Sequence, residues 1–224
     1  MKILAIDTTT EACSAALHIN GETCEKYEVA PRQHAELILQ MIDRLLAESE
    51  LPLSNIDGIA FACGPGAFTG VRLCTSVAQG LAYSVDLPLV SVSTLATLAQ
   101  GAPASAENIL SMLDARMGEI YWGAFLRENN SLVRSVSEER VCRPDEFLLE
   151  SNEHFHVVGP GWAKYDTILA DKLSEKLSDT YPDLLPRARH VAEIALNKFN
   201  NGESTTAKLA SPTYTRLLYS SITV

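Results

Sequence analysis

Three glycines and a proline fall within seven residues of the stretch GPGAFTGVR at residues 64–72, a composition suited to a phosphate-binding turn. An apolar run (59–63) precedes it and a helical pattern (71–85) follows, and the free N–H groups at a helix N-terminus favour anions. The spacing fits no common fingerprint, because a P-loop carries Lys after its last glycine and a dinucleotide turn has a third glycine where Thr69 stands. We therefore expect either a tight structural turn with Thr69 as helix cap or a weak phosphate contact.

Two carboxylates could act together with such a turn. Asp7 ends the apolar segment KILAID before three threonines, and Asp114 ends NILSMLD. An ATPase cleft of the sugar-kinase kind takes carboxylates from two lobes around Mg²⁺, with a phosphate loop after the first strand. We therefore define a weak or vestigial nucleotide-binding set: Asp7, Thr8, Thr9, Gly64, Gly66 and Asp114. The alternative is that both aspartates only end strands and cap turns, because the first loop lacks the glycine and basic residue that such loops often use.

Metal and nucleophilic chemistry have less support. His154 and His156 form an HxH pair that could supply two metal ligands, but no third ligand follows at a suitable spacing. There is no GxSxG and no local Cys/His signature, so we name no catalytic residue and no metal ligand. A peptidase triad assembled from distant residues stays open as an alternative.

Composition bounds the partners and the compartment. The net charge is −10, which argues against extended contact with a nucleic-acid backbone, so any role with RNA is expected to run through a partner. The five cysteines are odd in number and lack CxxC spacing, as suits a reducing compartment. The N-terminus has no signal-peptide pattern and no apolar run is long enough to span a membrane. We expect a soluble cytoplasmic protein.

The order of elements repeats along the chain. A strand ending in Asp, a hairpin, another strand, a helix, a strand, a Gly-Pro-Gly turn and a helix occur twice, and the first hairpin turns at Asn20-Gly21. The first copy is expected at 2–7, 12–19, 22–30, 33–50, 58–63 and 71–85. After a strand (89–92) and a helix capped by Ser93 (93–100), the second copy is expected at 108–114, 118–126, 131–142, 144–150, 154–158 and 163–177.

This repeat predicts an α/β protein with two similar β-β-β-α-β-α lobes. The linker GAPASAEN places the N-terminal lobe at 1–103 and the C-terminal lobe at 104–224. A last helix (187–202), closed by Gly202, either belongs to the second lobe or packs back on the first.

Two helices of the first lobe have wide apolar faces. Helix 71–85 is apolar nearly all round, so its outer side needs a cover, and helix 34–48 is similarly broad. Two such helices form half of an intermolecular four-helix bundle. We predict a partner interface made of Ile38, Met41, Leu45, Leu73, Ser76, Val77, Gly80 and Ser84. The alternative is that helix 187–202 covers this surface within the chain.

The motif set KILAIDTTTEACSAAL, RQHAELIL, GPGAFTGVRLCTSVAQGLA and SVSTLATLA resembles the bacterial TsaB family, also called YeaZ, through roughly the first 100 residues. The segment PTYTR (212–216) resembles the Pro-x-Tyr-x-Arg near that family's C-terminus. The resemblance implies an actin-like ASKHA fold, which is ribonuclease H-like. It also implies a role in making N6-threonylcarbamoyladenosine (t6A) at adenosine 37 of tRNAs that read ANN codons.

The resemblance further implies a non-catalytic scaffold. The chemistry would belong to a larger paralogue, TsaD, with a metal-binding HxxxH motif; here His34 falls at the first histidine and Ile38 at the second. Implied partners are the TsaD-type paralogue as a heterodimer and a TsaE-type ATPase, with a homodimer when the chain is alone. It implies no cofactor of its own and leaves open whether ATP or ADP is bound in the complex. An autonomous nucleotide-hydrolysing enzyme remains the alternative.

Overall fold

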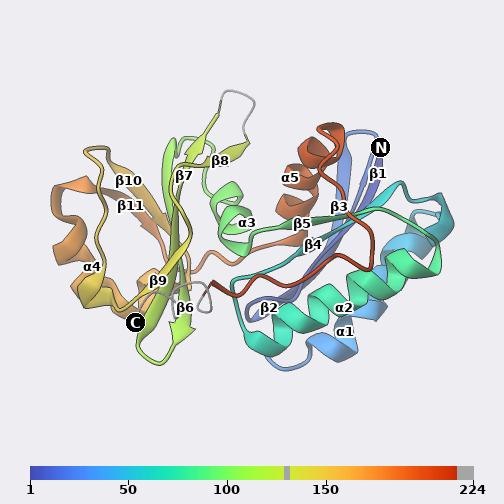
Figure 1. The fold of residues 1–224 in the computed structure, drawn as a ribbon, viewed down its shortest axis with the longest axis horizontal. Coiled ribbons are helices and arrows are strands. Elements are labelled where there is room, and N and C mark those ends of the chain that lie inside the picture. The colour runs from blue at the N-terminus through green and yellow to red at the C-terminus, as the bar shows by residue number, and fades with distance from the viewer. Residues whose placement is uncertain (129–131, 216–224) are drawn as a thin grey trace. The chain divides into compact units, whose positions relative to one another are not determined.

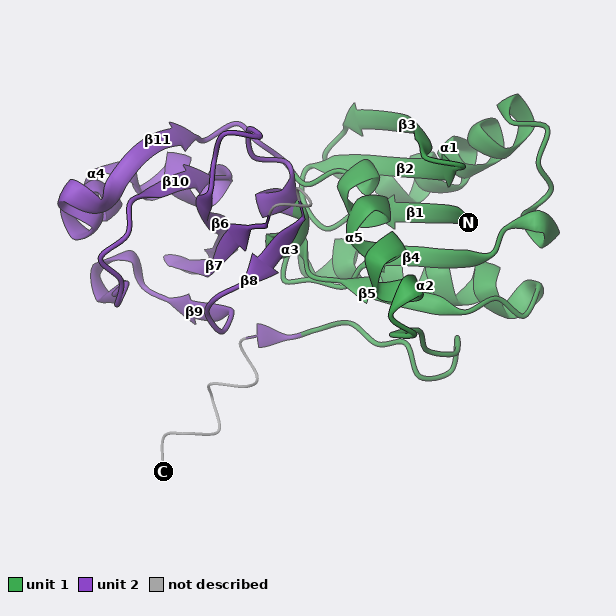
Figure 2. Cartoon of the chain, turned by 90° about the horizontal axis from the view of Figure 1, so that it is seen from above, with its two compact units in different colours: residues 1–97, 186–213 green, residues 98–185, 214–224 purple. Residues whose placement is uncertain are grey.

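A computed structural model describes residues 1–128 and 132–215, and the chain divides into two compact units. Unit 1 comprises residues 1–97 and 186–213, and unit 2 comprises residues 98–185 and the chain from 214 (Figure 2). The division therefore falls at 97 rather than at the linker near 103, and the chain returns to unit 1 at 186. Arg216, the last residue of PTYTR, lies outside the described residues.

Unit 1 is built on a five-stranded sheet with the order β3-β2-β1-β4-β5. The strands are β1 (Lys2–Asp7), β2 (Ala12–Ile19), β3 (Glu22–Val29), β4 (Gly58–Ala62) and β5 (Leu89–Val92). The first three form an antiparallel meander, and β4 and β5 run parallel to β1. Asn20 and Gly21 have φ values of 52° and 93°, the two positive angles that a tight hairpin turn between β2 and β3 requires.

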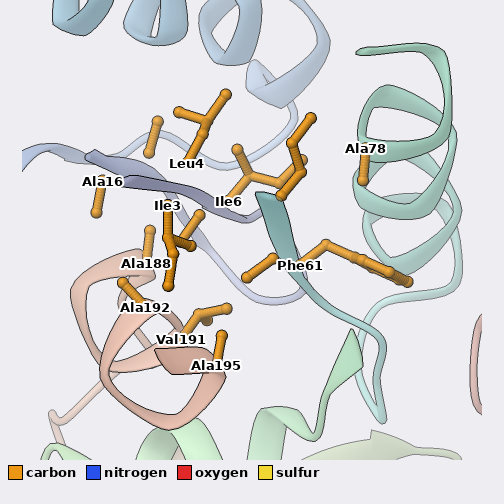
Figure 3. Packing of buried hydrophobic residues seen from close by; sticks show 14 of the residues in the cluster. Ile3, Leu4, Ile6, Ala16, Phe61, Ala78, Ala188, Val191, Ala192 and Ala195 are labelled. Carbon is orange, nitrogen blue, oxygen red and sulfur yellow. The ribbon is translucent and has the colours of Figure 1, made fainter. Parts of the chain in front are cut away.

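Helices cover both faces of this sheet (Figure 1). Helices α1 (His34–Glu48) and α2 (Phe68–Ser84) pack on one face, and α5 (Ala188–Asn200) packs on the other. In Figure 3, Ile3 points toward α5 and Leu4 points to the opposite face, so successive residues of β1 serve two cores. The alternative in which helix 187–202 covers the outer side of helix 71–85 is therefore wrong, because the sheet lies between them.

Unit 2 repeats the plan with a six-stranded sheet. Its order is β11-β10-β6-β7-β8, with β9 also pairing β7. The strands are β6 (Asn108–Arg116), β7 (Glu119–Arg127), β8 (Val133–Ser135), β9 (Arg140–Cys142), β10 (Phe155–Val158) and β11 (Leu177–Tyr181). Helix α4 (Pro160–Leu173) packs on β6 and β11, and short 3₁₀ turns are present at Leu53–Asn55, Pro144–Glu146 and Ser174–Lys176.

Several predicted elements differ from those observed. The strand expected at 131–142 is two short strands, β8 and β9, and residue 131 itself lies outside the described residues. The helix expected at 144–150 is a single 3₁₀ turn, and β11 has no counterpart in the prediction. By contrast, α3 (Thr94–Gln100) starts as predicted, because Ser93 Oγ accepts hydrogen bonds from the N–H groups of Leu95 and Ala96 at 3.1 and 3.3 Å.

Candidate functional site

The end of β1 forms a compact turn held by a buried carboxylate. Asp7 is 1% exposed, and its Oδ1 accepts hydrogen bonds from the backbone N–H of Thr9 at 2.8 Å and from Thr9 Oγ1 at 2.7 Å. Its Oδ2 is buried and has no hydrogen-bond partner among the described residues. Burial raises the pKa of Asp7 to about 6, with the two bonds from Thr9 opposing that rise.

The Gly-Pro-Gly turn and the start of α2 close directly onto this turn. The backbone N–H of Ala67 donates to the Thr9 carbonyl oxygen at 2.8 Å, and Thr8 Oγ1 donates to the Gly70 carbonyl at 2.7 Å. A Cβ atom added to Gly66 would collide with the Thr9 carbonyl oxygen. The N–H group of Ala67, which could have bound an anion at the start of α2, therefore bonds to the chain itself.

Two of the residues expected around the turn have other roles. The helix cap predicted at Thr69 is not observed, because α2 begins at Phe68 and its N-cap residue is Ala67. Gly64 has φ of 106°, and its carbonyl accepts the N–H of Thr94 at 2.9 Å. A Cβ there would lie 2.8 Å from the carbonyl oxygen of Thr213, so glycine is needed for both its angle and its packing.

Two thiols lie in the surroundings of Asp7, and neither is activated. Burial raises the pKa of Cys13 to about 12, and the charge of Asp7 adds to the shift. Burial also raises the pKa of Cys74 well above its ordinary value, and its Sγ donates to the carbonyl of Ile6 at 3.4 Å. A nucleophilic cysteine needs a lowered pKa, so these two thiols have the opposite electrostatic setting.

Asp114 belongs to unit 2, at the end of β6. Its carboxylate is paired with Lys164 Nζ at 2.9 Å and with the Arg116 guanidinium at 3.5 Å, and it accepts the Arg116 backbone N–H at 3.0 Å. A Mg²⁺ ion at this carboxylate would have to compete with two cations. The structure thus brings Asp7, Thr8, Thr9 and Gly66 together, while Gly64 faces the 213 region and Asp114 is part of the other unit.

The second Gly-Pro-Gly turn repeats the close packing of the first. Gly159 has φ of 105°, and a Cβ on Gly161 would lie 2.7 Å from the backbone N of Leu113 in β6. Each unit therefore packs its glycine turn against the backbone at the end of its first strand. This repeated contact accounts for the glycines without a bound phosphate.

The histidines form no metal cluster. His154 is exposed just before β10, and His156 lies 3.3 Å from Asp179. No group of three potential metal ligands occurs within the described residues. His34, the first residue of α1, has a buried Nε2 without a hydrogen-bond partner among these residues, and Ile38 one turn later is buried in the core.

Three residues of the predicted partner interface belong to the core of unit 1. Ile38, Met41 and Leu45 are 0%, 6% and 1% exposed on the inner side of α1, which packs on β2. They cannot contact a partner directly, and this part of the predicted residue set is corrected. Leu73 and Val77 are half-buried, and the remaining predicted residues are exposed, namely Ser76, Gly80 and Ser84.

The outer side of α2 is exposed and nearly uncharged. Among its 17 residues only Arg72 is charged, and its guanidinium carbon lies 3.8 Å from the centroid of the Phe68 ring. Phe68 and Tyr83 are 58% and 74% exposed, and we did not include either residue in the predicted interface. Their helical spacing with Ser76 and Gly80 places them on the same face of the helix, and this spacing could have identified them from the sequence. We call the exposed residues of this helix the α2 face: Phe68, Thr69, Arg72, Ser76, Gly80, Tyr83 and Ser84.

Comparisons with known proteins agree on one family. The sequence profile described as "TsaD: tRNA N6-adenosine threonylcarbamoyltransferase" matches residues 26–219. The "tRNA threonylcarbamoyladenosine biosynthesis protein TsaB" of Escherichia coli is 38% identical over 221 residues, covering 96% of this chain and 95% of that protein. The chain belongs to the TsaB (YeaZ) family. The TsaB of Haemophilus influenzae is also 38% identical, over 96% of this chain and 94% of its own length.

Solved structures support the same assignment. A Pseudomonas aeruginosa crystal structure, described as an uncharacterized protein with similarity to peptidase YEAZ, matches with a TM-score of 0.89 and 38% identity. The match covers 96% of this chain and 99% of the Pseudomonas aeruginosa chain. The two-unit fold of this TsaB-family chain is the actin-like ASKHA fold that its motifs predicted. Within its described residues, no helix combines the length and apolarity needed to cross a membrane.

Proposed function

We propose that this chain is a non-catalytic partner of a TsaD-type paralogue in t6A formation at adenosine 37 of tRNAs that read ANN codons. The TsaB relatives are named as t6A biosynthesis proteins, which supports the pathway. The closed turn at Asp7 and the cation-paired Asp114 support an accessory role, because neither is arranged to hold a phosphate or Mg²⁺. The paralogue would then supply the reaction and its metal.

The observation that carries the proposed partner role is Gly80 on the α2 face. It lies within the helix, and a Cβ added there would meet nothing within 4 Å. Glycine inside a helix costs about 1 kcal/mol relative to alanine, and no contact among the described residues uses the space that it leaves. A helix of a partner could use that space, because a missing side chain lets two helix backbones approach closely.

The partner chemistry follows from the profile match and from charge. The TsaD-type profile spans most of this chain, so a TsaD-type paralogue shares the fold and presents a corresponding helix pair. Identical chains commonly pair through the same surface on both subunits, so a homodimer through the α2 face is expected in the absence of the paralogue. Because the net charge is −10, we expect the partners, rather than this chain, to contact the tRNA. The complex would act in the cytoplasm. A TsaE-type ATPase would bring the nucleotide chemistry, and this chain needs no cofactor of its own.

The test is binding of the purified TsaD-type paralogue from the same organism. Gly80→Arg should abolish binding, because a long charged side chain would stand where a helix must pack. Ala163→Arg, on an exposed position of α4 in unit 2, is the matched control and should bind as the wild type does. Normal binding by Gly80→Arg, with a thermal unfolding midpoint no lower than that of the wild type, would overturn the proposal.

One observation favours a second candidate, an autonomous nucleotide hydrolase. Asp7 Oδ2 is buried without a hydrogen-bond partner in the described part of the chain, and burial raises the pKa of Asp7 to about 6, which suits a general base. This candidate predicts Mg²⁺-dependent phosphate release by the chain alone, lost in Asp7→Asn. An absence of turnover above that of Asp7→Asn would dismiss it.

A further inference from the structure

The segment after α5 returns along the edge of unit 1 beside α2 (Figure 1). We call residues 203–213 the strap. Thr205 exchanges two backbone hydrogen bonds with Leu89 of β5, at 2.9 and 2.8 Å. At its far end the N–H of Thr213 donates to the carbonyl of Cys63 at 2.7 Å. The strap is therefore fixed at both ends to unit 1.

Gln79 of α2 binds the middle of the strap at two points. Gln79 Nε2 donates to the carbonyl of Ala207 at 3.1 Å and to that of Ala210 at 2.9 Å. An amide nitrogen carries two hydrogens, so this one group satisfies both carbonyls. This part of the strap buries little apolar surface, because the side chains that it turns inward are two alanines. Ala210 is buried and Ala207 is half-buried. Gln79 is thus the main link between the middle of the strap and α2.

This link sets an exposed apolar residue of the strap beside the α2 face. Leu209 lies between the two residues that Gln79 binds, and its side chain is 74% exposed. Tyr83, one helical turn after Gln79, is also 74% exposed. A large apolar side chain that is mostly exposed on an anchored segment adds little to the fold of unit 1, but suits the core of an interface.

We propose that the strap is a second contact element of the surface that binds the TsaD-type paralogue, with Leu209 as its apolar contact and Gln79 as the residue that positions it. The proposal rests on the proposed function. The paralogue is the favoured occupant because Gln79 holds the strap against α2, the helix whose exposed face is proposed to bind it. The strap also carries only two charged residues, Glu203 and Lys208, so it continues the nearly uncharged α2 face.

Binding of the full-length chain to the purified paralogue from the same organism tests this. Leu209→Asp should raise Kd by about tenfold or more, the effect of removing a well-placed apolar contact. Leu148→Asp, at a 66% exposed leucine of unit 2, is the matched control and should change Kd by less than about twofold. The thermal unfolding midpoint should be the same in both variants.

The role of Gln79 has its own test. Gln79→Glu places a carboxylate against two carbonyls and should release the strap, raising Kd by a similar factor. If Gln79 acts through the strap, combining Gln79→Glu with Leu209→Asp should weaken binding little more than either change alone. Fully additive effects would overturn the positioning role, because they would mean that the two residues act independently.

Gly80→Arg separates this proposal from the one on which it rests. Loss of binding by Gly80→Arg with wild-type binding by Leu209→Asp would overturn the strap proposal alone. Wild-type binding by both variants, or no binding by the wild type, would overturn the paralogue surface and the strap together. If Leu209→Asp abolished only self-association, measured by sedimentation, the occupant would be a second copy of this chain and the proposal would fail.

Discussion

The backbone N–H of Ala67 at the start of α2 donates a 2.8 Å hydrogen bond to the carbonyl oxygen of Thr9 at the end of β1. This bond joins the loop after β1 directly to the Gly-Pro-Gly turn, the two segments in which the sequence suggested a phosphate contact. Gly66 and Gly70 make the contact possible, because a Cβ on either would collide with the carbonyl oxygen of Thr9 or Thr8. The glycine-rich turn therefore serves packing in this chain.

Adding one methyl group at Gly66 should destabilise unit 1. Gly66→Ala must displace the backbone of Thr9, because the obstructing atom is a carbonyl oxygen rather than a flexible side chain. We expect a loss of about 3 kcal/mol in the free energy of unfolding, at the upper end of overpacking effects. Urea denaturation measures this, and a loss below the error of the method would show that the turn can open.

The same change at Gly80 should have the opposite effect on stability. Gly80→Ala meets open space, so the helix gains about 1 kcal/mol from the better propensity of alanine. If the space receives a partner helix, the variant should at the same time bind the TsaD-type paralogue more weakly. Denaturation and binding measured on one preparation test both parts. Tighter or equal binding would mean that no backbone packs closely at Gly80.

Asp7 should make stability depend on pH in an unusual direction. Its pKa is raised from 3.8 to about 6 by burial, so the folded chain holds a proton that the unfolded chain releases between these values. The contribution of Asp7 to stability is therefore full below pH 4 and is lost as pH rises through 6, by about 3 kcal/mol in all. Urea unfolding at pH 4.5 and 7.5 should show that Asp7→Asn loses less stability between these values than the wild type. Parallel losses in the two proteins would contradict the raised pKa.

Removing the Arg127 side chain should strongly lower the free energy of unfolding. Its guanidinium donates to the carbonyls of Ala102 and Ala106 at 3.1 and 3.2 Å and to that of Ala99 at 3.3 Å, around the end of α3. Arg127→Ala leaves these carbonyls without their cationic donor, and we expect a loss of about 2–3 kcal/mol in the free energy of unfolding. Arg127→Lys, which keeps the charge but not the planar fork, should recover only part of it. Full recovery in Arg127→Lys would show that charge alone matters.

Local signals predicted much of the fold because they act over a few residues. Asn20-Gly21 forms its turn through positive φ angles, and Ser93 caps α3 through its own hydroxyl. The strand β11, with sequence LSDTY, was missed because it is a polar edge strand with no apolar face to mark it. The order of strands and helices also suggested the duplication, since both copies have a strand that ends in Asp and a Gly-Pro-Gly turn before a helix.

The site was harder to predict because periodicity does not say what covers a face. The apolar residues of α1 and α2 showed a wide stripe, but only the structure separates Ile38 and Leu45, which meet β2, from Gly80, which meets solvent. The strap contact of Gln79 joins residues 128 and 131 positions apart, and no local pattern specifies such a pair. The ion pair of Asp114 with Lys164 is long-range in the same way.

The most direct test of a non-catalytic partner role is t6A itself, measured in bulk tRNA by nucleoside mass spectrometry after depletion of this chain in its host. The account predicts that t6A falls, that a copy carrying Asp7→Asn and Asp114→Asn restores it, and that a Gly80→Arg copy does not. Unchanged t6A on depletion, or failure of a stably folded Asp7→Asn, Asp114→Asn copy to restore it, would contradict the account.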